Sequence, residues 1–175
     1  MTIEQPISPT LGDAHRSAVD DANRWRGHCV DKYTRAEARM REAIEIMLVH
    51  PDGVGLRRPS MFGQHVAELA KAVALDGPFA SPGGKVRDAL GKCESGFSLR
   101  NIVTHAVSTV WIDRRGRWLW HYHFQPAGKG KPITSGSLTQ HEAMQFEREL
   151  VSSIDRLEDH LQVFVRTLAS PATQP

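Results

Sequence analysis

The chain has 175 residues, and its hydrophobic fraction of 40% and charged fraction of 24% are typical of a folded globular protein rather than a disordered one. The length suits one domain. The formal net charge is only +2, so the protein as a whole has no strong positive potential that would attract nucleic acids. Any contact with RNA must therefore come from a local cluster of basic residues.

The cysteines and the chain ends indicate the compartment. Cys29 and Cys93 have no Cys neighbour in sequence, so we expect two buried thiols in a reducing compartment rather than a disulfide or a zinc site. Residues 1–10 lack the charged-then-apolar layout of a signal peptide, and no run of about 18 apolar residues occurs. These features predict a cytoplasmic protein with no membrane partner and with flexible tails at 1–10 and 170–175.

The first predicted element is a helix of about nine turns that ends before His50-Pro51. Its apolar residues follow one another by steps of three and four, and its other side, which includes Glu37, carries charged residues that predict a solvated face. The apolar stripe consists of Ala14, Ala18, Ala22, Trp25, Cys29, Tyr33, Ala36, Met40, Ile44 and Met47.

Two further helices follow. One is predicted from Ser60 to Asp76, with Phe62, Val66, Leu69 and Val73 on one side, and a Gly- and Pro-rich loop then covers Gly77–Gly84. The next helical pattern spans Lys85–His105, and we expect Ser95-Gly96 to kink or divide it.

The periodicity then becomes alternating, which predicts a β-hairpin over about 107–125 with its turn at residues 113–116. In the second strand Trp118, Trp120, Tyr122 and Phe124 share one face, expected to pack onto the helices, while Leu119, His121 and His123 share the other. A polar loop is expected over Pro126–Leu138. Thr139 and Glu142 form a capping-box pattern that opens the last helix, which ends at Ser170-Pro171.

Together these elements predict a mainly α fold. We expect a four- to five-helix bundle in one domain, residues 11–169, with a β-hairpin inserted before the last helix. The long first and last helices are expected to be antiparallel neighbours.

The stretch from Arg100 to His105 carries the most suggestive chemistry. Asn101 and His105 are four residues apart and lie one above the other on a helix. Arginine is a fixed cation for phosphate, and histidine can take or give a proton near neutral pH. Asparagine can orient a ring or a ribose hydroxyl. These groups could assist metal-free cleavage of RNA by its own 2′-hydroxyl.

At these residues the chain resembles the HEPN superfamily, helical domains whose catalytic signature is Arg, four to six residues, then His, often with a polar residue after the Arg. The matching residues are Arg100, Asn101 and His105. The resemblance implies a homodimer with the motifs facing each other across a cleft, and a metal-independent ribonuclease that needs no cofactor. It also implies a toxin–antitoxin or defence setting with a possible cognate antitoxin, although many family members are inactive binding modules.

Two other groups are candidate substrate-binding residues. Arg114, Arg115 and Arg117 form, with Lys129 and Lys131, the densest positive cluster, which could bind an RNA backbone or could be a solvated turn that protects an edge strand. His121 and His123 could bind phosphate beside His105. Their spacing can also chelate a metal, but no acidic or Cys partner accompanies them, so no metal site is predicted.

Two functions remain open from the sequence. The first is a dimeric HEPN-type ribonuclease that uses Arg100, Asn101 and His105. The alternative is a non-catalytic helical module that binds a protein or nucleic acid, in which these three residues have structural roles within one subunit.

Overall fold

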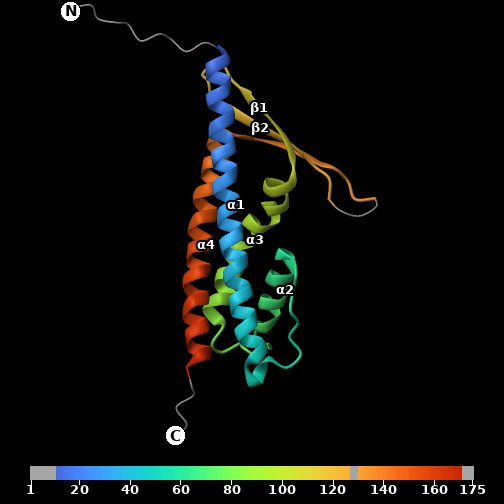
Figure 1. Ribbon diagram of the computed structural model, residues 1–175, viewed down its shortest axis with the longest axis vertical. Helices are drawn as coiled ribbons and strands as arrows, with labels where there is room; N and C mark the ends of the chain where they lie inside the picture. Colours follow the sequence, from blue (N-terminus) through green and yellow to red (C-terminus); the bar gives the residue numbers. More distant parts are fainter. Residues whose placement is uncertain (1–10, 127–129, 171–175) are drawn as a thin grey trace, which may run out of the picture. The chain divides into compact units, whose positions relative to one another are not determined.

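The computed structural model describes residues 11–126 and 130–170 (Figure 1). Its elements in chain order are α1 Leu11–Val49, a 3-10 turn Pro51–Gly53, α2 Phe62–Ala72, α3 Gly84–His105, β1 Val107–Ile112, β2 Trp118–Phe124, β3 Thr134–Thr139 and α4 Gln140–Ala169. The predicted mainly α fold with a β-hairpin before the last helix is therefore confirmed, and the hairpin is part of a three-stranded sheet. The predictions for residues 1–10, 171–175 and Lys129 lie outside the described residues.

The chain divides into two compact units. The first, Met1–His28 with Asn101–Glu147, holds the start of α1, the end of α3, the whole sheet and the start of α4. The second, Cys29–Arg100 with Arg148–Pro175, holds α2 and the remaining parts of the three long helices. A single domain over 11–169 stays a prediction. Among the described helices, none is both long and apolar enough to cross a membrane.

In the first unit the sheet packs against α1 through tryptophans. The strand order is β1-β2-β3, with both pairs antiparallel, and Figure 1 shows the sheet beside the first part of α1. The Trp25 ring lies 5.8 Å from Trp118 and 5.3 Å from Trp120, and its Nε1 donates to the Ala143 carbonyl at 2.8 Å. The predicted packing of the aromatic strand face onto a helix is confirmed.

The third strand corrects the sequence prediction. Pro126–Leu138 was expected to be a loop, but Thr134–Thr139 pairs with Leu119–Phe124 along its whole length. Gly136 lies opposite Tyr122, and a Cβ at this position would come within 2.5 Å of the Tyr122 hydroxyl oxygen. Position 136 holds a glycine because the ring of Tyr122 on the neighbouring strand lies where a side chain would be.

In the second unit α2 and parts of α1, α3 and α4 meet around large apolar side chains. The predicted stripe of α1 is buried here, including Tyr33, Met40 and Met47. Helix α2 is shorter than the predicted Ser60–Asp76, and the loop after it buries Phe79, whose ring lies 6.1 Å from that of Phe164 on α4. The loop is therefore anchored into the core by its one aromatic residue.

Helix α3 continues through Ser95-Gly96, so the division that was one of the two expectations there is wrong, and the kink stays a prediction. The Gly96 carbonyl accepts a hydrogen bond from the Tyr33 hydroxyl at 2.7 Å. A Cβ on Gly96 would lie 3.0 Å from Leu150 Cδ1, so glycine allows α3 and α4 to approach closely. Burial raises the pKa of Tyr33 well above its ordinary range, which keeps the hydroxyl protonated as a donor.

Helices α1 and α4 are parallel, so the antiparallel prediction is wrong. In the second unit Lys32 pairs with Asp155 at 2.6 Å and Arg35 with Glu158 at 2.8 Å, so both residue numbers rise together. In the first unit Trp25 reaches Ala143 and His28 reaches Glu147, in the same sense. Two helices joined by a short loop are usually antiparallel neighbours. Helix α4 is instead preceded by the three-stranded sheet, so no short loop determines its direction.

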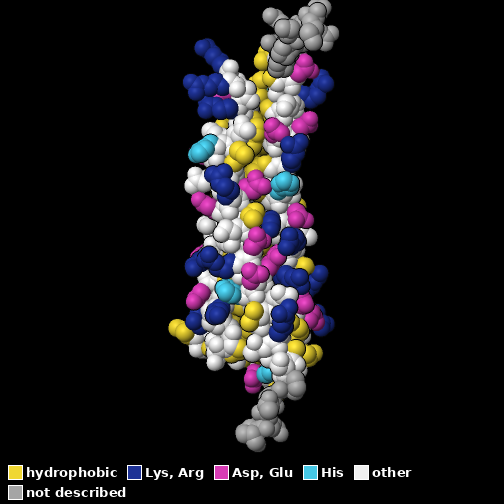
Figure 2. All heavy atoms as spheres, turned by 90° about the vertical axis from the view of Figure 1, so that its left-hand side faces the viewer, with side chains coloured by type: hydrophobic (Ala, Val, Ile, Leu, Met, Phe, Trp, Pro, Cys, Tyr) yellow, Lys and Arg dark blue, Asp and Glu magenta, His cyan; other side chains and the backbone are white. Residues whose placement is uncertain are grey.

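The surface of these helices carries both signs of charge. On the face shown in Figure 2, basic and acidic side chains are mixed over most of the surface, and basic side chains gather at the upper left of the view. This pattern agrees with the ion pairs between α1 and α4 and with the small net charge of the chain. The face shown is therefore a solvated, paired surface.

Arg26 closes the C-terminal end of α3. The guanidinium Nε donates to the Val103 carbonyl at 2.6 Å, and Nη2 donates to the carbonyls of Thr104 at 3.1 Å and Ala106 at 3.2 Å. The last carbonyls of a helix have no partner within the helix, and a cation there also meets the negative end of the helix dipole. One side chain of α1 thus fixes the junction between α3 and β1.

Arg26→Met should lower the free energy of unfolding by at least about 2 kcal/mol, because partly buried carbonyls lose a charged donor. The measurement is urea unfolding followed by circular dichroism. The matched control is Arg24→Met, since Arg24 is exposed and pairs only with Asp21 one helical turn away, and its loss should cost less than about 0.5 kcal/mol. Equal effects of the two substitutions would contradict the capping role of Arg26.

The predicted capping box at the start of α4 is confirmed. The Thr139 backbone N–H and hydroxyl donate to Glu142 Oε2 at 2.8 and 2.7 Å, and the Glu142 N–H donates to the Thr139 hydroxyl at 3.3 Å. These hydrogen bonds, that of the Thr139 side chain first, lower the pKa of Glu142. Glu142 therefore stabilises the fold while it is ionised.

Glu142→Gln should destabilise the protein near neutral pH, and the difference from the wild type should shrink as the pH falls. The folded pKa lies below the unfolded one, so the stabilisation is complete above the unfolded pKa of about 4.3 and is lost as the pH falls through the folded pKa. Urea unfolding at neutral and at acidic pH measures the difference. Thr139→Ala should give the same pH dependence, and a difference that grows on acidification would contradict the assignment.

Candidate functional site

The last turns of α3 carry the three residues of the predicted catalytic motif. Asn101 and His105 belong to the first unit, lie one turn apart on the helix and are both exposed. His105 is the last residue of α3. Arg26 caps this end of the helix by donating to the carbonyls of the two residues next to His105, Thr104 and Ala106. A proton-transfer group at this position would therefore have a fixed backbone.

Arg100 belongs to the second unit, and its side chain is 22% exposed. Its Nη2 lies 3.9 Å from Glu37 Oε2 on α1, and its Cζ lies 5.2 Å from the ring centroid of Phe62 on α2. The guanidinium thus has a carboxylate on one side and an aromatic face on another. Arg100 contributes to packing among three helices of this unit.

Glu37 and His65 are residues that the sequence reading missed. Glu37 was assigned to a solvated face, but its side chain is 27% exposed and its Oε1 lies 3.4 Å from His65 Nδ1. His65 is buried among apolar residues of α2, and neither of its ring nitrogens makes a hydrogen bond in this structure. The carboxylate therefore lies between an imidazole and the Arg100 guanidinium. The spacing of apolar residues in α2 predicts that Val66 is on the buried side of the helix, and it does not predict that His65 is buried.

The hairpin arginines lie in the turn between β1 and β2. Asp113 accepts hydrogen bonds from the backbone N–H groups of Arg115 and Arg117 and pairs with the Arg117 side chain at 2.7 Å. These contacts, led by the Arg117 N–H, lower the pKa of Asp113. Arg114, Arg115 and Arg117 are all exposed, and the charge of Arg117 is partly compensated by Asp113.

His121 and His123 lie on the outer face of β2. Their ring centroids are 4.7 Å apart with the planes at 82°, and the two Nε2 atoms are 3.1 Å apart. The structure thus brings these two predicted residues into direct contact with each other.

The sheet register places the predicted residues at two different ends. Val107 follows His105 by two residues and pairs with His123, so the end of α3 and His123 share one end of the sheet. The arginine turn follows the Ile112–Trp118 pair at the opposite end. Five residue steps along a strand cover about 17 Å. The arginines of the turn and His105 therefore cannot bind the same phosphate group, although they could contact separate parts of a longer RNA.

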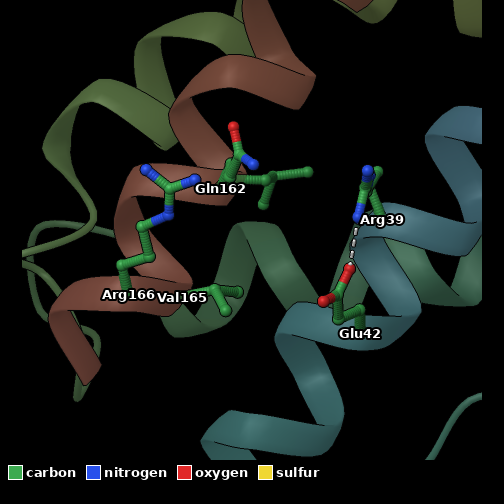
Figure 3. Close-up of a pocket in the computed structure, with 6 residues that line it drawn as sticks. Arg39, Glu42, Gln162, Val165 and Arg166 are labelled. Atoms are coloured by element: carbon green, nitrogen blue, oxygen red, sulfur yellow. Dashed lines mark hydrogen bonds and ion pairs between the residues drawn. The ribbon is translucent and has the colours of Figure 1, made fainter. Parts of the chain in front are cut away.

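A hollow in the second unit involves none of the predicted site residues. It has a volume of about 180 Å³ and is lined by Arg39 and Glu42 on α1 and by Leu161, Gln162, Val165 and Arg166 on α4. Figure 3 shows Arg39 turned towards Glu42 in an ion pair of 2.9 Å. Small-molecule sites usually exceed roughly 300 Å³, so this hollow does not compete with α3 as the candidate site.

A double-mutant cycle on Arg100 and Glu37 should measure a favourable coupling of about 0.5–1 kcal/mol in the free energy of unfolding, because the partly buried pair is 3.9 Å apart. The variants are Arg100→Met, Glu37→Gln and the combination, compared by urea unfolding. Arg100→Met should cost more than Glu37→Gln, since it also loses the contact with Phe62. A coupling of about zero would show that the pair contributes nothing to the second unit.

Comparison of the chain with family models, curated proteins and solved structures finds no match. The resemblance to the HEPN superfamily accordingly rests on Arg100, Asn101 and His105 and on the helical layout, and it stays a prediction. Any function assigned to the chain is argued from the geometry of these residues.

Proposed function

We propose that the protein is a metal-independent endoribonuclease of the HEPN type that acts as a cytoplasmic homodimer on RNA. His105 transfers the proton, Arg100 stabilises the phosphate and Asn101 orients the substrate. The observation that carries the proposal is the exposure of Asn101 and His105, one turn apart, at the end of a helix held by Arg26. A toxin or defence role, with a cognate antitoxin as partner, is part of the same proposal.

The proposed reaction uses the RNA's own 2′-hydroxyl as nucleophile. The 2′-oxygen attacks the adjacent phosphorus and loses its proton, the bond from phosphorus to the 5′-oxygen breaks, and that oxygen takes up a proton. The products end in a 2′,3′-cyclic phosphate and a 5′-hydroxyl. An imidazole that takes or gives a proton contributes about 100- to 10,000-fold to such steps, and a guanidinium offsets the charge of the pentacoordinate phosphorus.

Glu37 has a defined part in this proposal. Its carboxylate at 3.9 Å, together with the ring of Phe62, holds the Arg100 guanidinium in one orientation. A positioned cation loses less side-chain entropy when a phosphate binds. Glu37 also neutralises part of the charge, so it sets a limit on how strongly Arg100 can attract RNA.

The same contacts favour a second function, a non-catalytic module that binds a protein or a nucleic acid. Arg100 is 22% exposed and already compensated by Glu37 within its own chain, which is the arrangement expected of a structural arginine. In this alternative the exposed residues at the end of α3 and on the outer sheet face contact a partner without chemistry.

The deciding experiment is cleavage of a broad RNA panel by the full chain in EDTA. The proposal expects products with cyclic phosphate ends, and His105→Ala should lower the rate at least about 100-fold. His141→Ala is the matched control, because His141 is an exposed histidine of the same unit outside the motif, and it should cleave like the wild type. Circular dichroism checks that each variant is folded.

Further variants separate the two functions. Arg100→Met should lose cleavage as His105→Ala does, whereas Glu37→Gln should stay within about tenfold of the wild type because the guanidinium remains. A folded wild-type protein that cleaves no RNA of the panel would refute the enzyme and leave the binding module. Cleavage that persists in His105→Ala would refute the role of this histidine.

A further inference from the structure

The outer face of the sheet holds a pair of histidines arranged as two ligands for one ion. His121 and His123 are two residues apart on β2, so both side chains leave the same face of the strand. Their Nε2 atoms converge to 3.1 Å, while the rings stand nearly perpendicular at 82°. A separation of 3.1 Å is short enough for an N–H···N hydrogen bond between the rings, and it is also the spacing of two nitrogens that bind one ion.

Each histidine is oriented by a serine of the neighbouring strand. His121 Nδ1 lies 2.8 Å from Ser137 Oγ, and His123 Nδ1 lies 2.7 Å from Ser135 Oγ. The register pairs each serine directly with its histidine, so both contacts follow from the same antiparallel pairing of β2 and β3. When a serine hydroxyl accepts from Nδ1–H, the Nε2 atom of that histidine carries the lone pair that an ion would bind.

The separation of the two Nε2 atoms matches a metal chelate. Imidazole nitrogens bind Zn²⁺ at about 2.0–2.1 Å, so two nitrogens 3.1 Å apart would subtend an angle of about 100° at the ion, close to the tetrahedral value. In metal sites the second nitrogen of a ligating histidine usually donates to an oxygen, which the two serines supply here. The histidines therefore have both the distance between ligand atoms and the orienting groups that a chelate requires.

We propose that His121 and His123 bind one divalent transition-metal ion of the Zn²⁺ and Ni²⁺ class through their Nε2 atoms, with Ser137 and Ser135 as orienting groups. Among the described residues no group of three or more His, Cys, Asp or Glu side chains could hold a metal, so this part of the chain supplies two ligands. The remaining positions are filled from outside, by water or by the same pair of a second copy.

This site is separate from the proposed ribonuclease chemistry, which needs no metal. Both cysteines are buried and do not compete for an added ion. The outer face is open to solvent beside the histidines, where Val107 and Trp111 are 76% and 60% exposed. The ion can therefore enter without any opening of the fold.

The test is isothermal titration of the full chain, without an affinity tag, with Zn²⁺ and with Ni²⁺. Saturable binding is expected at one ion per chain or one ion per two chains, with sedimentation velocity showing a Zn²⁺-induced dimer in the second case. His121→Ala and His123→Ala should each weaken Kd at least tenfold, and Ser135→Ala with Ser137→Ala about tenfold. His141→Ala should bind like the wild type, and Mg²⁺ should not bind because it prefers oxygen ligands.

His123 is exposed and His121 is half-buried, and circular dichroism checks that each variant is folded. Wild-type protein that binds Zn²⁺ no better than the double variant His121→Ala/His123→Ala would overturn the proposal, and the 3.1 Å contact would then be a hydrogen bond between two neutral imidazoles. Equal loss of binding in His141→Ala would overturn it as well. Cleavage of RNA is measured in EDTA, separately from metal binding. Failure of the metal-binding proposal therefore leaves the ribonuclease proposal in place, and the reverse also holds.

Discussion

The contact between Arg26 and the end of α3 is the interaction on which the candidate site of this protein depends. One guanidinium donates to the carbonyls of Val103, Thr104 and Ala106, at the point where the chain changes from helix to strand. Carbonyls at a helix end that lose their partners and stay partly buried destabilise the fold strongly. Because His105 lies inside this capped segment, a side chain of α1 determines where the candidate catalytic imidazole is held.

The sheet has two chemically different faces, and the candidate functions follow from this difference. Its inner face places Trp118 and Trp120 against Trp25, which provides the apolar contact that ties the strands to a helix. Its outer face needs no apolar side chains, so residues such as His121 and His123 can be polar there. The alternation of one strand therefore separates the part of the sheet that stabilises the unit from the part that can bind a ligand.

The contacts of Arg100 agree both with a structural role and with a catalytic role. A guanidinium beside a carboxylate and above an aromatic ring is a stabilising feature of many helical proteins, and Glu37 and Phe62 provide both. The same contacts would also prepare the cation for a phosphate. The physical difference lies in the response to substrate, since a catalytic arginine contributes more in the transition state than in the unbound protein. The structure shows the contacts of Arg100 in the unbound protein, and cleavage rates of the Arg100 variant measure its contribution in the transition state.

Features that depend on local patterns could be predicted from the amino-acid sequence. The apolar stripe fixed α1, the alternation of residues 118–124 fixed a strand with an aromatic inner face, and the Thr139–Glu142 capping box fixed the start of α4. Three features could not be predicted in this way and follow from contacts in the folded chain: the parallel course of α1 and α4, the strand at Thr134–Thr139, and the contacts of Glu37 with His65 and Arg100. These features join residues far apart in the chain, and small polar residues become a strand only because β2 offers them hydrogen-bonding partners. Periodicity reports how a segment buries its own side chains, but it carries no information about which distant segment they meet.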